Sequence, residues 1–106
     1  MCFMQAMEKR AHLRVPLVTK VDVESDGYAF LAVAQDISAG GMRIATANPP
    51  LAGTLLTLTF VLPNTERKIR VRAVVRHVVE GSAMGVEFAD VSADDKVAIR
   101  AFVEAQ

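Results

Sequence analysis

Apolar and polar side chains alternate with a period of two over most of this chain, from Val15 to Ala89. In the longest such stretch, Arg67 to Glu80, small and β-branched apolar residues occupy one side and arginines the other. Successive side chains of a β-strand point to opposite faces, so the alternation predicts strands with one buried and one solvated face. A chain with this pattern is expected to fold around a sheet and not as a bundle of helices.

Turn and breaker residues divide the alternating region into six predicted strands. The first strand ends at Ser25-Asp26-Gly27, where the Asp-Gly pair is typical of a hairpin turn. The return strand, 28–37, is apolar on both faces and is therefore expected to be largely covered. The later strands are predicted at 42–46, about 56–62, 67–80 and about 84–88. Short connections without intervening helices predict an all-β fold, a closed or nearly closed six-stranded antiparallel barrel.

The period changes at the C-terminal end. Ser92 is a predicted helix N-cap, and Asp94 and Asp95 fall in the first turn, where the helix dipole favours anions. The residues that follow are mostly apolar, so this C-terminal α-helix is expected to lie on the barrel or on a partner. With 106 residues the chain forms one predicted domain, a barrel with its helix at 15–106, preceded by an arm at 1–14.

Composition argues against several classes of function. Twelve lysines and arginines balance twelve acidic residues, so bulk charge does not favour binding to a nucleic-acid polymer. The longest apolar run has seven residues, too short for membrane insertion, and the order of charges in the leader does not match a signal peptide. We therefore expect a cytoplasmic protein. One cysteine and two histidines are scattered, which predicts no disulfide, metal site or catalytic centre.

Two short polar signals bracket the first predicted hairpin. Arg10 and Arg14 stand four residues apart in a basic leader, and Asp36, Ser38 and Gly41 follow the return strand. Each signal alone has an ordinary explanation, a solvated basic arm for the first and local capping of a turn for the second. A hairpin brings the end of the second strand back to the start of the first, so the two signals are expected to lie close together.

This order of residues resembles the PilZ domain family. The resemblance rests on Arg10-x-x-x-Arg14, Asp36-x-Ser38-x-x-Gly41 and the segment 85–88 before the predicted helix, and it extends from about Glu8 to the end of the chain. PilZ domains are, as a family, receptors for the bacterial second messenger cyclic di-GMP. The resemblance implies that the two arginines contact the phosphates and guanine edges of this ligand from the arm. It also implies a complementary surface on the barrel at the second signal.

The chemistry of guanine agrees with these residue types. A guanidinium fork matches the paired acceptors O6 and N7, and the carboxylate of Asp36 can accept hydrogen bonds from N1–H and the N2 amine. The hydroxyl of Ser38 can donate or accept, and Gly41 has no Cβ to block a close approach. Ser38 has Asp36 nearby but no sequence-evident base to activate it as a nucleophile, so no enzyme activity is predicted.

Two positions depart from a stronger match to the family. Many members carry an arginine directly before the first motif arginine, whereas this chain has Lys9, which keeps the charge but lacks the planar fork. The chain also contains no tryptophan to stack on a guanine. Arg76 could supply a stacking plane instead, or could belong to a solvated strand face with Arg70 and Arg72.

The resulting expectation is a stand-alone receptor that binds cyclic di-GMP and signals by contact to an unknown protein effector. The arm at 1–14 is expected to be mobile without ligand and to fold over the nucleotide. One rival is a protein-interaction module of the same fold that does not bind nucleotide. A second is a small nucleic-acid-binding barrel whose basic stripe is formed by Arg70, Arg72 and Arg76.

Overall fold

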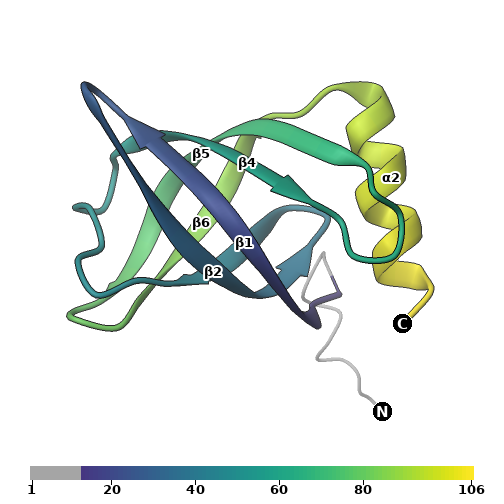
Figure 1. The fold of residues 1–106 in the computed structure, drawn as a ribbon, viewed down its shortest axis with the longest axis horizontal. Helices are drawn as coiled ribbons and strands as arrows, with labels where there is room; N and C mark the ends of the chain where they lie inside the picture. The colour runs from purple at the N-terminus through teal and green to yellow at the C-terminus, as the bar shows by residue number, and fades with distance from the viewer. Residues whose placement is uncertain (1–12) are drawn as a thin grey trace, which may run out of the picture.

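The computed structural model describes residues 13–106, which form a closed barrel of six antiparallel strands with a helix at its C-terminal end (Figure 1). Around the barrel the strands follow the order β1-β2-β3-β6-β5-β4, and β4 pairs again with β1. The predicted six-stranded barrel with a C-terminal helix is therefore confirmed. The elements are β1 (Val15–Ser25), β2 (Tyr28–Ser38), β3 (Gly41–Ala45), β4 (Leu55–Val61), β5 (Lys68–Val79), β6 (Ala83–Asp90) and α2 (Ala93–Glu104).

The alternating apolar side chains of the strands meet inside the barrel. Val21 and Val23 of β1 are fully buried, while Asp22 between them faces solvent. The same alternation buries Leu58 on β4 and Val71 on β5. Burial of apolar surface at about 25 cal/mol per Å² makes this interior the main source of stability. It also fixes the register, because a slip by one residue would turn each buried face outward.

The outer face of β2 differs from the prediction. Leu31 is 61% exposed, Val33 is 41% exposed and Tyr28 is also exposed, so the expectation that the return strand is largely covered is wrong. The physical reason is the position of α2, which lies across one end of the barrel and leaves the outer wall of β2 uncovered (Figure 1). Strand β3 also begins one residue earlier than predicted, at Gly41, because this residue pairs with both neighbouring strands.

Helix α2 is capped and attached as its sequence suggests. The Ser92 hydroxyl accepts a hydrogen bond from the backbone N–H of Asp95 at 3.1 Å, which satisfies one of the free donors of the first turn. The carboxylate of Asp95 forms an ion pair with Arg67 at 2.9 Å and thereby links the helix to the β4–β5 connection. Ile99, Phe102 and Val103 are the buried residues of the helix, and they extend the barrel core. Within residues 13–106, no helix has both the length and the apolar character needed to cross a membrane.

The ion pair of Asp95 leads to a prediction about stability. Asp95→Ala should lower the free energy of unfolding by about 1 kcal/mol more than Asp94→Ala, measured by urea denaturation. Both variants remove an acidic residue from the first turn and thus weaken the interaction with the helix dipole equally. The Asp95 variant also loses the ion pair with Arg67. In this pair the Asp95 side chain is only 15% exposed. Equal losses in the two variants would show that this contact does not help to hold the helix.

Candidate ligand-binding site

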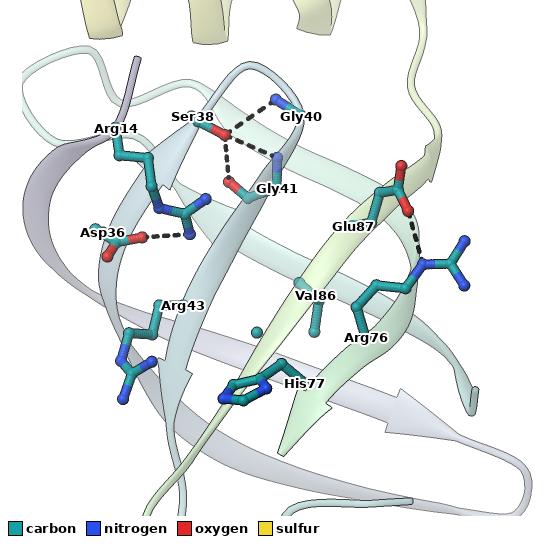
Figure 2. A pocket seen from close by; sticks show the side chains of 11 residues that line it. Arg14, Asp36, Ser38, Gly40, Gly41, Arg43, Arg76, His77, Val86 and Glu87 are labelled. Carbon is teal, nitrogen blue, oxygen red and sulfur yellow. Dashed lines mark hydrogen bonds and ion pairs between the residues drawn. The ribbon is translucent and has the colours of Figure 1, made fainter. Parts of the chain in front are cut away.

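A cavity of about 530 Å³ opens on the side of the barrel, where the β2–β3 turn approaches β5 and β6 (Figure 2). Its lining brings together most of the residues that the sequence singles out, together with several that it does not. Lys9 and Arg10 lie outside the described residues. The lining residues are Arg14, Asp36, Ser38, Gly40, Gly41, Arg43, Arg76, His77, Gly85, Val86 and Glu87.

Arg14 and Asp36 form an ion pair at one side of this cavity. The distance between Arg14 Nη2 and Asp36 Oδ1 is 2.8 Å, and the side chains are 42% and 27% exposed. The register of the first hairpin explains the contact, since Val15 pairs with Ile37 and Pro16 with Asp36. The chain just before β1 therefore passes the end of β2. Residues 22 positions apart in the sequence become direct neighbours, as the hairpin argument predicts.

Ser38 is buried, and its hydroxyl is engaged by the β2–β3 turn. Its Oγ accepts hydrogen bonds from the backbone N–H groups of Gly40 at 3.2 Å and Gly41 at 3.1 Å, and donates to the carbonyl of Gly41 at 3.4 Å. These contacts use the one donor and two acceptor positions that a hydroxyl possesses. They are the contacts of a turn cap, so Ser38 shapes the loop at the cavity. Ser38 also belongs to the cavity lining, and its contact with a ligand stays a prediction.

Gly41 lies where two strands approach each other closely. It pairs with Ser38 on β2 and with Glu87 on β6. A Cβ atom built on Gly41 would overlap the backbone carbonyl of Val86 and lie 3.3 Å from the Cα of Glu87. The sequence suggests that the missing side chain lets the ligand or the arm approach the backbone closely. In the structure the neighbouring strand β6 also needs this space, and because Gly41 lines the cavity its contact with a ligand stays a prediction.

Arg76 lines the cavity wall on β5, opposite the Arg14–Asp36 pair (Figure 2). Its Nε donates to Glu87 Oε1 at 2.7 Å, and the two side chains are 61% and 59% exposed. The other two arginines of the suggested basic stripe, Arg70 and Arg72, are absent from this lining, and Arg70 pairs with Glu24 at 3.4 Å. Arg76 thus lines the cavity, whereas Arg70 and Arg72 do not.

Three polar lining residues are missing from the sequence-based site. Arg43 stands opposite Asp36 in the β2–β3 register, and its Nε donates to Gln35 at 3.1 Å. Aligning the β2 and β3 strands around their turn would have found it. His77 on β5 pairs with Gly85 on β6, next to a register irregularity between the two strands. Glu87 follows Gly85 on β6. No local signal in the sequence marks His77, because its position depends on that irregularity. Glu87 lies in the segment 85–88 that supports the family resemblance, but the sequence does not assign it to the site.

The charges of the lining favour an anionic ligand with hydrogen-bond donors. Three arginines, Arg14, Arg43 and Arg76, surround the cavity, against two carboxylates, those of Asp36 and Glu87. Arginine offers planar forks that bind phosphates and guanine edges in bidentate fashion, and a carboxylate accepts from N–H donors. Among residues 13–106, no group of three or more His, Cys, Asp or Glu side chains is arranged to hold a metal ion.

Comparison with solved structures identifies related folds. The inhibitor of motility of Bacillus subtilis (MotI/DgrA) matches with a TM-score of 0.82 at 27% sequence identity, over 91% of this chain and 50% of that one. This chain therefore spans about half the length of that protein. The PilZ domain of CeSA from a cellulose-synthesizing bacterium matches with a TM-score of 0.70 at 16% identity, over 88% and 96% of the two chains.

A third structure and a family model complete the comparison. The PlzA protein of Borreliella burgdorferi, solved in complex with c-di-GMP, matches with a TM-score of 0.71 at 14% identity, over 92% of this chain and 42% of that one. No curated protein sequence matches this chain. A family model described as PilZ domain matches residues 8–105, nearly the entire chain. The chain therefore belongs to the PilZ domain family.

Proposed function

We propose that this protein is a receptor for cyclic di-GMP that passes the signal to a protein partner. The observation that carries the proposal is that Arg14, Asp36 and Arg76 line one cavity, although they come from three separate parts of the chain. Membership of the PilZ family supports it, as does the similar fold of PlzA, which was solved with c-di-GMP bound. The role is recognition of a ligand, and the residues invoked bind the ligand without transforming it.

The Arg14–Asp36 pair is compatible with this binding role. A guanidinium has five N–H donors, and the pair joins only the Nη2 and Oδ1 atoms. Arg14 can thus donate to a phosphate or to guanine O6 and N7 while it remains beside Asp36. Asp36 can accept from guanine N1–H and the N2 amine through its second oxygen. The pair holds both groups at one side of the cavity, which lowers the entropy lost when a ligand binds.

The remaining parts of the proposal concern the N-terminal arm. Lys9 and Arg10 would add a cation and a second guanidinium fork from the segment that precedes Arg14. Arg76 would provide either a phosphate contact or a stacking plane from the opposite wall. Closure of residues 1–14 over the ligand would create a surface that exists only in the bound state, which a protein partner could recognise.

Isothermal titration calorimetry with cyclic di-GMP tests the proposed function directly, because it reports affinity and stoichiometry together. We expect saturable binding of cyclic di-GMP and much weaker binding of cyclic di-AMP. If cyclic di-GMP produces no heat and no protection against thermal unfolding, the protein is an interaction module of this fold instead. Salt-dependent binding of random oligonucleotides, unaffected by cyclic di-GMP, would point to the nucleic-acid alternative.

Asp36 should determine the preference for guanine. We expect Asp36→Ala to weaken the binding of cyclic di-GMP more than that of cyclic di-AMP, because adenine presents an acceptor at N1 where guanine presents a donor. The two dissociation constants can be compared by calorimetry on the variant and the parent protein. Equal losses for both nucleotides, together with a lower melting temperature, would show that Asp36 serves mainly to position Arg14.

A further inference from the structure

Glu87 places a negative charge in the wall of a cavity that is otherwise suited to an anion. Its carboxylate lies 2.7 Å from the Nε of Arg76, and both residues line the cavity (Figure 2). Asp36, the other carboxylate of the lining, has a direct role in the proposed recognition of guanine, whereas Glu87 has none. Its backbone pairs with Gly41 on β3 and Val74 on β5, which fixes it beside the β2–β3 turn.

The Arg76–Glu87 pair competes with any anion that approaches this wall. The Nε–H of Arg76, one of its five donors, is already engaged, and the neighbouring carboxylate repels a phosphate brought to the same guanidinium. Both side chains are more than half exposed, so the pair is weak and can open. A ligand phosphate can therefore take the place of Glu87, at some loss of affinity.

A second cavity gives the displaced carboxylate other cations to face. This cavity of about 410 Å³ lies beside the first and shares Gly40 and Glu87 with it. Lys96 and Arg100 of α2 belong to its lining. The Glu87 side chain thus forms part of the boundary between an arginine on β5 and two cations on the helix. Rotation away from Arg76 would leave it near these two cations and the carboxylate of Asp90, which also lines the second cavity.

We propose that Glu87 is an affinity-determining residue of the site: it is the counter-ion of Arg76 in the free protein and must be displaced when the phosphate of an anionic ligand reaches Arg76. The identity of that ligand as cyclic di-GMP rests on the proposed function, whereas the competition for Arg76 applies to any phosphate. Removing the charge while keeping the shape, as in Glu87→Gln, frees the guanidinium for the ligand.

The test is a double-mutant cycle with Glu87→Gln, Arg76→Ala and the combined variant. Cyclic di-GMP and inorganic pyrophosphate serve as probes, followed by calorimetry and by NMR of the arginine Nε–H groups at low ionic strength. We expect Glu87→Gln to bind both probes about two- to fivefold more tightly, the size of effect that an exposed ion pair produces. In the Arg76→Ala background the same change should produce no gain, since there is no guanidinium to release.

Glu24→Gln is the matched control, because Glu24 forms a similar surface pair with Arg70 outside the cavity lining. It should leave both affinities unchanged. A gain that persists without Arg76, or no gain in Glu87→Gln, would overturn the proposal, and weaker binding would show that Glu87 contacts the ligand itself. If pyrophosphate follows the expected cycle while cyclic di-GMP binds to no variant, the proposed function fails and the role of Glu87 stands. If neither probe binds to any variant, both fail.

Discussion

Replacing Arg14 by alanine is expected to weaken cyclic di-GMP binding by about 5- to 150-fold, because a bidentate guanidinium contact contributes about 1–3 kcal/mol. The melting temperature should change little. Arg14 is 42% exposed and pairs with a carboxylate that is itself in contact with water, so the fold loses only a surface interaction. Calorimetry gives the affinity, and thermal unfolding of the same preparation gives the stability.

Arg70→Ala is the control for this loss. Arg70 also forms a surface ion pair, with Glu24 at 3.4 Å, but it is absent from the cavity lining. The Arg70→Ala variant should therefore bind cyclic di-GMP with the affinity of the parent protein. Arg10→Ala is expected to behave as Arg14→Ala does, although Arg10 lies outside the described residues. Unchanged affinity in both the Arg10 and the Arg14 variants would exclude the arm from the site.

Gly41→Ala is expected to lower the free energy of unfolding by about 1–3 kcal/mol, which corresponds to a fall in melting temperature of roughly 5–20 °C. The new methyl group would overlap the carbonyl of Val86, and backbone cannot move aside as a flexible side chain can. The strands β3 and β6 would have to separate at the pairing of Gly41 with Glu87. Thermal and urea unfolding both measure the effect.

Gly85→Ala provides a matched control on the strand that Gly41 contacts. Gly85 also lines the cavity, but a Cβ atom there would meet only the Cβ of His77, at an ordinary contact distance of 3.6 Å. Its stability should stay within about 0.5 kcal/mol of the parent protein. If Gly41→Ala is as stable as Gly85→Ala, the backbone of the barrel is more adaptable than its strand pairing suggests. Gly41 would then be free to serve the ligand, as its sequence motif first indicates.

Much of the fold could be predicted because its signals are local. A period of two and a turn such as Asp26-Gly27 depend on neighbouring residues, and six strands with short connections leave few arrangements that bury every apolar face. The failure at β2 has a different origin. The sequence predicts that Leu31 and Val33 are covered, because both faces of the strand are apolar. Which outer surfaces of the barrel are covered depends on the position of α2.

Local signals were sufficient to predict the strands, the helix and the proximity of Arg14 to Asp36, since one hairpin is enough to bring the latter two together. The residues on the opposite wall of the cavity depend on long-range strand pairing. Strict alternation along β5 would turn Arg76 and His77 to opposite faces, yet both line the cavity, because the register with β6 shifts between Val75 and His77. Such a shift depends on how two distant strands pair, as does the pairing of Val74 with Glu87, which brings Glu87 close to Arg76.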